Sequence, residues 1–220
     1  MEEKRLNNSN KHHLVGTVGF RIMGFFFVIT LLVIVIFEIF YLQSINQYYY
    51  DNMASVLHNQ ARYNADLYLT YFSDTDLMDV IVENKNQFYR SNDSQVQIVS
   101  NDGTVLYDGI GTDLVGEQLS TADVLAAQDN RYEVYIGNVP YDTQKVMSVS
   151  YPLRNQSQQV GFIRLTTSLQ SVDRIVMDRA ATSIIFSLAA LTISVILSYL
   201  LSRSIINPIS DLTKVAKKLA

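Results

Sequence analysis

The sequence predicts an α+β domain, with a long N-terminal helix and a five-stranded antiparallel sheet, flanked by two transmembrane helices. Three observations lead to this prediction. Two long apolar blocks occupy residues 22–42 and 181–202, a helical pattern follows the first block, and strand-like alternation fills much of residues 95–166. A run of helices followed by a run of strands is typical of α+β domains.

Both apolar blocks are long enough to cross a bilayer, whose hydrocarbon core of about 30 Å requires about 20 helical residues. Residues 181–202 carry no charged side chain, and residues 22–42 carry only Glu38. No small-x-small cleavage site follows the first block, so we interpret it as an uncleaved anchor rather than a signal peptide. Glu38 lies one turn from the outer end, where it is expected to extend to the membrane surface; a hydrogen bond across a dimer is the alternative.

Basic residues flank the two spans on the same side of the membrane, which predicts that both termini are cytoplasmic. The expected order is a cytoplasmic tail at 1–21, transmembrane helices at 22–42 and 181–202, an extracytoplasmic domain at 43–180 between them, and a cytoplasmic segment at 203–220. The predicted location is the cell membrane, crossed twice, with lipid as a partner. The basic residues are Lys4, Arg5, Lys11, Arg21, Arg203, Lys214, Lys217 and Lys218.

The segment between the spans is acidic, with nine basic and 17 acidic residues and a net charge of −8. This sign argues against nucleic acid as a partner and leaves small solutes, cations and basic peptides as ligands. The chain contains no Cys, so no disulfide or thiol site is possible. The outer domain is therefore expected to be held by packing alone.

Local patterns give the order of elements in the outer domain. A helix over 43–72 presents Ile45, Tyr49, Met53, Val56, Tyr63 and Leu67 as an apolar stripe, and a second helix is expected over 76–88. Strands over 95–100 and 104–108 surround the turn Asn101-Asp102-Gly103. A glycine-marked loop over 109–116 precedes a helix over 120–127, capped by Ser120 or Thr121. Strands over 132–136, 145–153 and 159–166 follow, and a helix over 168–179 leads into the second span.

Two groups of residues carry a resemblance to a known family. The hairpin Val96 to Leu106, together with Met147 to Leu153 and Gly161 to Leu165, resembles a bacterial extracytoplasmic Cache or PAS-like sensor domain, which would cover 43–180. After the second span, Arg203 to Ala220 resembles the truncated first helix of a HAMP linker. Its residues Ile205, Ile209, Leu212, Ala216 and Leu219 step by four and three, as in the seam of a parallel coiled coil, and Pro208 fits a first helical turn.

The HAMP resemblance implies a homodimeric receptor whose output domain follows residue 220. Such a region occurs most often in sensor histidine kinases, and this is the class that the resemblance favours. A chemoreceptor, a cyclic-dinucleotide enzyme and a kinase-less membrane adaptor are the alternative classes. We expect no catalytic core and no cofactor in these 220 residues. ATP, Mg²⁺ and a response regulator are expected for the missing kinase half, and the second span is expected to carry the signal by a piston, tilt or rotation.

Two candidate sites for an unknown extracytoplasmic ligand emerge. The first is a small-molecule pocket under the 109–116 loop, although the Trp of the family's common amino-acid motif is absent; the second is an acidic patch that would hold divalent cations against the membrane. No transition-metal site is expected, because the three His do not come with other converging ligands. The pocket residues are Tyr107, Tyr132, Ser148, Ser150, Arg154 and Arg164, and the patch residues are Asp74, Asp76, Asp79 and Glu83.

Overall fold

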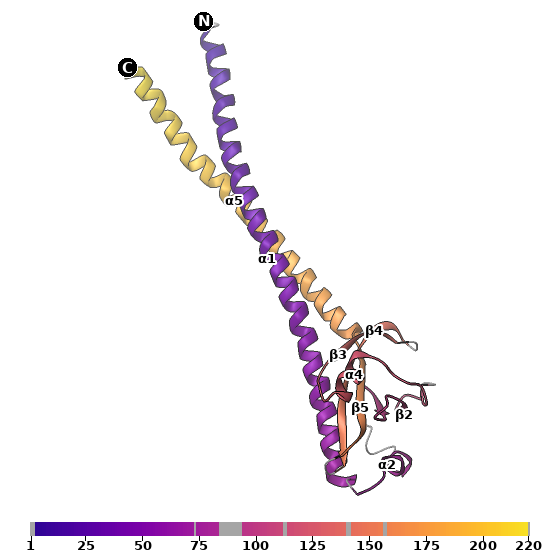
Figure 1. Cartoon of the computed structure of the whole chain (residues 1–220). Helices are drawn as coiled ribbons and strands as arrows, with labels where there is room; N and C mark the ends of the chain where they lie inside the picture. The colour runs from indigo at the N-terminus through magenta and orange to yellow at the C-terminus, as the bar shows by residue number, and fades with distance from the viewer. Residues whose placement is uncertain are drawn as a thin grey trace. The chain divides into compact units, whose positions relative to one another are not determined.

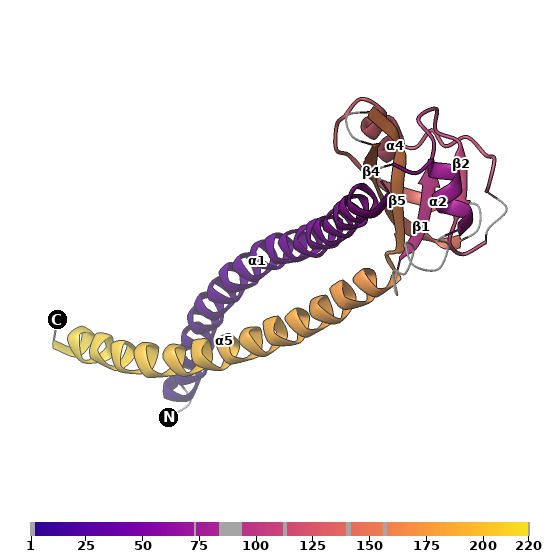
Figure 2. The same ribbon diagram turned by 90° about the horizontal axis from the view of Figure 1, so that it is seen from below.

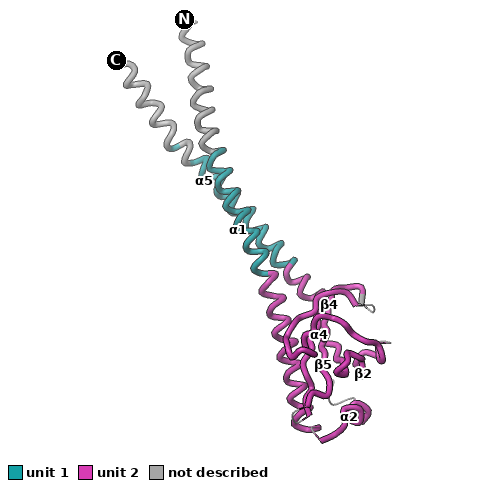
Figure 3. Tube along the Cα trace, in the orientation of Figure 1, with its two compact units in different colours: residues 1–45, 177–220 teal, residues 46–176 magenta. Residues whose placement is uncertain are grey.

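The computed structural model describes residues 3–72, 74–83, 94–111, 114–139, 142–155 and 158–219, and their side chains apart from residues 3–23, 142, 201–203 and 205–219. The chain divides into two compact units (Figure 3): residues 1–45 with 177–220 form the first, and residues 46–176 form the second. Two long helices contribute to both units, α1 (Glu3–Phe72) and α5 (Gln170–Leu219).

The second unit is an α+β domain (Figure 1). After α1 it contains α2 (Leu77–Glu83), β1 (Gln95–Val99), β2 (Val105–Asp108), α4 (Ala122–Gln128), β3 (Val134–Val139), β4 (Asp142–Asn155) and β5 (Gln158–Ser168), and α5 begins directly afterwards. The predicted fold class, a PAS/Cache-like α+β domain with a long N-terminal helix and five antiparallel strands, is confirmed. Strands β4 and β5 are longer than predicted, and residues 84–88 of the expected second helix lie outside the described residues.

The sheet has the strand order β2-β1-β5-β4-β3, and every neighbouring pair is antiparallel. The last strand in sequence, β5, lies between β1 and β4 near the centre of the sheet (Figure 2). Opposite residues include Gln97 and Arg164 in the β1–β5 pair, and Ser150 and Arg164 in the β4–β5 pair. The central position of β5 therefore brings residues from the first and last parts of the domain side by side.

One face of the sheet is apolar and packs against α1, from which Leu57, Ala61, Ala65 and Tyr68 are buried. The small side chains of the two alanines allow the helix to approach the sheet closely. The predicted stripe is wrong in part, because Val56 and Tyr63 are 42% and 64% exposed. Tyr49, Met53 and Leu67 of the predicted stripe are partly buried against the core, whereas the fully buried residues lie mainly one position further, or about 100° around the helix. The main sheet residues in this core are Val96, Ile98, Met147, Val149, Leu153, Ile163 and Leu165.

The predicted turn between β1 and β2 is present. Gly103 has a φ of +93°, a conformation that glycine adopts without steric cost. Asp102 accepts hydrogen bonds from the hydroxyl of Ser100 and from the backbone N–H and Oγ1 of Thr104, the latter two at 3.1 Å. These hydrogen bonds, first that of Ser100, hold the pKa of Asp102 below its usual value. The local turn contacts account for Asp102 without a functional role.

The first unit consists of helical segments of α1 and α5. Of the described residues, Gly24–Phe72 and Gln170–Leu200 are helices long and apolar enough to cross a membrane. Their apolar side chains are mostly exposed, for example Phe37 and Phe186. The carboxylate of Glu38 accepts hydrogen bonds from Ser183 and Ser187 of the same chain, an interaction that neither sequence expectation included.

Candidate functional site

The second face of the sheet is lined by buried polar side chains, and we call this set, with Asp123 of α4, the polar face. Alternate residues of a strand point to the same face, so the antiparallel register aligns polar residues from neighbouring strands in two rows. One row crosses β2, β1, β5 and β4, and the other crosses β1, β5 and β4. The first row is Asp108, Gln97, Arg164 and Ser150, and the second is Gln95, Thr166 and Ser148; all seven are buried.

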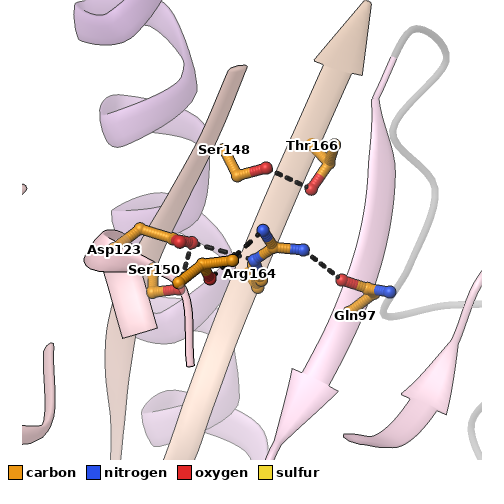
Figure 4. Close-up of polar contacts among 7 residues, drawn as sticks. Gln97, Asp123, Ser148, Ser150, Arg164 and Thr166 are labelled. Carbon is orange, nitrogen blue, oxygen red and sulfur yellow. Dashed lines mark hydrogen bonds and ion pairs between the residues drawn. The ribbon is translucent and has the colours of Figure 1, made fainter. Parts of the chain in front are cut away.

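Arg164 occupies the centre of the polar face and is only 1% exposed. Its Nε donates to Asp123 Oδ2 and its Nη1 donates to Gln97 Oε1, both at 2.8 Å (Figure 4). Its Nη2 lies 3.5 Å from Oγ1 of Thr121, the residue that precedes α4. All three guanidinium nitrogens are thus engaged by groups of the chain itself, as a buried charge requires.

The network continues from Gln97 to Asp108 at the end of β2. Gln97 Nε2 donates to Asp108 Oδ2 at 3.3 Å, and Gln95 Nε2 donates to Oδ1 at 2.8 Å. The backbone N–H of Ile110 also donates to Oδ1, at 3.2 Å. Because Gln97 accepts from Arg164 and donates to Asp108, it connects the guanidinium to a second carboxyl group.

Asp123 reaches the sheet from the first turn of α4, which is held in place by Val124 and Ala127 packing against Val99 and Phe162. Its Oδ2 accepts hydrogen bonds from Arg164 and from Ser150 Oγ, both at 2.8 Å. Its Oδ1 is buried and has no hydrogen-bond partner within the described part of the chain. A buried acceptor without a donor is unfavourable, so Asp123 Oδ1 is a position where a donor group of another molecule would be stabilised.

The structure brings three of the six predicted pocket residues together. Ser148, Ser150 and Arg164 belong to the polar face, where Ser148 Oγ and Thr166 Oγ1 are 2.8 Å apart. The other three lie elsewhere in the domain.

Tyr107 packs against the apolar core next to α1. Tyr132 is half exposed and its ring lies 4.4 Å from that of His58 on α1. Arg154 is exposed and donates to Asn130 Oδ1 at 3.0 Å. These three side chains therefore do not form one site with Arg164.

Sequence reasoning missed the partners of Arg164 on the polar face. The signal was present, because Gln95 and Gln97 alternate with apolar residues in β1, as Arg164 and Thr166 do in β5. Alternation of this kind usually marks a solvent-facing side of a sheet, whereas here the polar side is buried. The alternation of the strands could not identify Asp123, because this residue lies on the short helix α4 and not on a strand.

The predicted acidic patch extends from just before α2 to its last residue, Glu83. All four residues are exposed, and Asp76 Oδ1 accepts from the backbone N–H of Met78, as at a helix N-terminus. Among the described residues, no three His, Cys, Asp or Glu side chains gather as a metal site requires. Binding of divalent cations by Asp74, Asp76, Asp79 and Glu83 stays a prediction.

His58 lies on α1 with its ring edge-on to two tyrosines, at 4.4 Å from Tyr132 and 5.5 Å from Tyr151 between centroids. Burial, and secondarily the charge of Arg62, lowers the pKa of His58 below its usual 6.5. Its Nδ1 is buried and has no hydrogen-bond partner among the described residues. His58 is therefore a half-buried residue that packs against Tyr132 and Tyr151.

The predicted HAMP segment is helical in the structure, because α5 continues without interruption from Gln170 through Pro208 to Leu219. The side chains of the proposed seam, Ile205, Pro208, Ile209, Leu212, Ala216 and Leu219, lie outside the described residues. Their packing therefore stays a prediction.

The observations define the class of structure: a PAS/Cache-like α+β domain with a buried polar sheet face, in a chain that also has two candidate transmembrane helices. No protein-family model matches the chain, and no curated protein matches it.

Several solved structures are similar to this chain. The sensor domain of the Vibrio cholerae histidine kinase DctB is 14% identical, with 60% of this chain and 56% of that chain covered and a TM-score of 0.42. The ligand-binding domain of the Campylobacter jejuni chemoreceptor Tlp3 is 17% identical, with 59% and 57% covered and a TM-score of 0.47. The Escherichia coli DcuS sensor domain is 12% identical, with 60% and 96% covered and a TM-score of 0.38.

Proposed function

We propose that this chain perceives an extracytoplasmic stimulus and transmits it across the membrane through its second span. The observation that carries the proposal is the connection between β5 and α5. Strand β5 contributes Arg164 and Thr166 to the polar face, and after Leu169 the chain continues as one helix from Gln170 to Leu219. A ligand that changes the pairing of Arg164 therefore acts on a strand that is covalently joined to the second candidate span.

The proposed ligand contact is the polar face next to Asp123. The guanidinium of Arg164 is already engaged by Asp123, Gln97 and Thr121, so an anionic ligand would have to displace Asp123. Asp123 Oδ1 has no partner in the described residues, so a small ligand with an N–H or O–H donor would gain a hydrogen bond there without breaking one that this oxygen already accepts. The proposed ligand is thus a small molecule with a polar donor group rather than an anion.

We place the α+β unit outside the cell membrane and both termini of the chain in the cytoplasm. The basic residues at the inner ends of both spans support this orientation. The net charge of −8 between the spans supports a small solute or a cation rather than nucleic acid as ligand.

We propose that these residues form the sensor region of a homodimeric sensor histidine kinase. The support is the resemblance of residues 203–220 to a HAMP helix. In such a kinase, a cytoplasmic catalytic half would bind ATP and Mg²⁺ and phosphorylate a response regulator. A chemoreceptor, a cyclic-dinucleotide enzyme or a kinase-less adaptor would use the same sensor and spans, so the output domain is the part that separates these alternatives.

Ligand binding is tested by calorimetry of the full chain in lipid nanodiscs against fractionated metabolite pools. A pool that gives heat with the parent chain is expected to give none with Asp123→Asn, because the amide carbonyl stays with Arg164 and Ser150 and the NH2 group takes the place of the proposed acceptor. The titration is run well below the melting temperature of the variant, so that loss of heat reports binding rather than unfolding. Asp129→Asn is the matched control, since Asp129 pairs with Arg131 on the surface, where both side chains are 65% exposed. No heat from any pool, or equal loss in both variants, would argue against a site at Asp123.

Transmission and dimerisation are tested with single cysteines at Ile205, Ile209 and Leu212 in membrane vesicles, because the chain has no native Cys. A parallel seam predicts interchain disulfides at all three positions, with yields that change when an active pool is added. Identical yields with and without that pool would reject transmission through the seam, and absence of interchain disulfides would reject the homodimer.

A further inference from the structure

The apolar helices of the first unit are joined by hydrogen bonds between polar side chains. Ser183 and Ser187, one turn apart on α5, donate to Oε2 of Glu38 on α1 at 3.0 and 2.9 Å. The hydroxyls of Thr30 and Ser194 lie 3.1 Å apart and share a further hydrogen bond. We call these five residues the span clasp.

The clasp residues are directed between the two helices rather than outward. All five are half-buried, whereas the neighbours Phe37 and Ile39 of Glu38 are 62% and 60% exposed. Glu38 Oε1 is also buried, and it has no hydrogen-bond partner in the described part of the chain. The carboxyl group is therefore held against α5, and the serine hydroxyls are its hydrogen-bond donors.

The spacing of the polar residues on α5 distinguishes one register from its neighbours. Residues four apart occupy the same helical face, so a one-turn shift of α5 in one direction replaces Ser187 by Leu191 opposite Glu38. A one-turn shift in the other direction brings Arg179 to the position of Ser183. In a hydrocarbon environment a polar group without a partner is costly. The observed register gives Glu38 two hydroxyl donors, the first shift leaves it one, and the second exchanges one hydroxyl for the guanidinium of Arg179.

We propose that the span clasp selects one register of the second span against the first, with Glu38 as the positioning residue. Glu38 and its two serines define the position of α5 near one end of the clasp, and the Thr30–Ser194 pair defines it two helical turns further along α1. The idea that this register is the resting state of a signal transmitter rests on the proposed function. The existence of the register does not.

The test measures the register directly in the full chain, reconstituted in lipid vesicles. Ile34 lies midway between Thr30 and Glu38, Leu191 lies between Ser187 and Ser194, and both are half-buried. The cysteine pair Ile34→Cys and Leu191→Cys is expected to form an intrachain disulfide on mild oxidation. A second pair, Ile34→Cys with Val195→Cys, reports a register displaced by one turn.

Glu38→Leu is expected to lower the ratio of the Ile34–Leu191 to the Ile34–Val195 disulfide yield at least about threefold, the effect of an average hydrogen bond between membrane helices on the equilibrium between two registers. The Ile34–Val195 yield is expected to rise. Glu38→Gln keeps a carbonyl acceptor for the serines and is expected to retain the parent pattern. The double variant Ser183→Ala with Ser187→Ala is expected to reproduce Glu38→Leu while leaving the carboxyl group in place.

The matched control is Thr192→Val, because Thr192 is exposed and its hydroxyl donates to Leu188 of its own helix. It removes a hydroxyl from the same helix and is expected to change neither yield. An unchanged ratio of the two yields in Glu38→Leu would overturn the proposal, as would a fall in Glu38→Leu that the double serine variant does not reproduce. These yields require no ligand and no output domain, so failure of the proposed function would leave them unaffected.

Discussion

The ion pair of Arg164 and Asp123 is buried, and burial makes the loss of either residue more costly than in an exposed ion pair of the same length. Its N–O distance is 2.8 Å, equal to that of the pair Arg131–Asp129, but the Arg164 and Asp123 side chains are only 2% and 0% exposed. When one residue of a buried ion pair is removed, the remaining charge is left without compensation and out of contact with water. In a surface pair, water solvates the charge that remains. The polar face is therefore sensitive to the loss of one charge.

Asp123→Asn is predicted to destabilise the α+β unit by about 3–5 kcal/mol, because it leaves the guanidinium of Arg164 buried without a counter-charge. Thermal unfolding of the full chain in detergent measures the change. The double variant Arg164→Met with Asp123→Leu removes both charges and is expected to recover much of the loss. Asp129→Asn is the control and is expected to leave the melting temperature unchanged; equal effects of the two asparagine variants would contradict the prediction.

His58 gives the α+β unit a predicted pH dependence. Burial lowers its pKa in the folded state below 6.5, so the unfolded chain binds a proton at a higher pH than the folded chain. Stability from this group is complete above about pH 6.5, falls as the pH decreases towards the folded pKa, and is constant below it. The charged group that faces the ring is Arg62, and the packed aromatic groups are Tyr132 and Tyr151.

The corresponding measurement compares melting temperatures at about pH 7.5 and about pH 5.5, on either side of the ordinary His pKa. The parent chain is expected to lose more stability on acidification than His58→Gln, which cannot bind the proton. The same loss in both chains would show that other groups control the pH dependence.

At the scale of the elements, strand β5 is the centre of the domain. It pairs with β1 and β4, contributes Ile163 and Leu165 to the apolar core, and contributes Arg164 to the polar face. The sequence predicted this strand and its β4 partner correctly, because both have strong alternation and a polar turn between them. It did not predict that the polar side of β5 is covered, since burial of that side depends on α4 and on residues far away in the chain.

Gly161→Ala is predicted to weaken β5 and lower stability by about 1–3 kcal/mol, as expected for overpacking. An added Cβ would lie 2.6 Å from the backbone oxygen of Val99 and 3.2 Å from Leu77 Cδ2, and the backbone oxygen cannot turn aside as a flexible side chain can. Thermal unfolding is again the measurement. Gly24→Ala, whose Cβ would meet no atom within 4 Å, is the control; a similar melting temperature for Gly161→Ala would show that the strand adjusts freely.

For helix α1, periodicity predicted the length of the helix better than its buried face. The predicted stripe included Val56 and Tyr63, while the structure buries Leu57, Ala61 and Ala65. Alanine carries little hydrophobic signal, yet its small side chain is what close packing against the sheet requires. A pattern based on large apolar residues therefore identified the wrong side at these positions.

At the scale of the whole chain, the apolar composition of two helices was readable from sequence, but the hydrogen bonds between them were not. The sequence placed Glu38 in an apolar segment, and its partners Ser183 and Ser187 follow about 145 residues later. Only the folded structure identifies which hydroxyls meet the carboxyl group. Contacts of such long sequence separation leave no local pattern.

The proposed topology predicts that position 129 lies outside the cell and position 204 inside. In chains with a single cysteine, Asp129→Cys is expected to react with a membrane-impermeant maleimide on intact cells, and Ser204→Cys is expected to react only after permeabilisation. Both positions are exposed, and the chain has no native Cys. Labelling of Ser204→Cys on intact cells would contradict the orientation.

The first turn of α5 begins in the core of the α+β unit, where Leu169 and Val172 are both buried. Leu169 also donates its backbone N–H to the carbonyl oxygen of Lys145 on β4, at 2.9 Å. Rotation of this part of the chain about the helix axis would expose the apolar side chains of Leu169 and Val172 to water. The beginning of the helix is therefore held to the sheet. The orientation of α5 about its own axis at this point is accordingly fixed by its contacts with β4 and the apolar core.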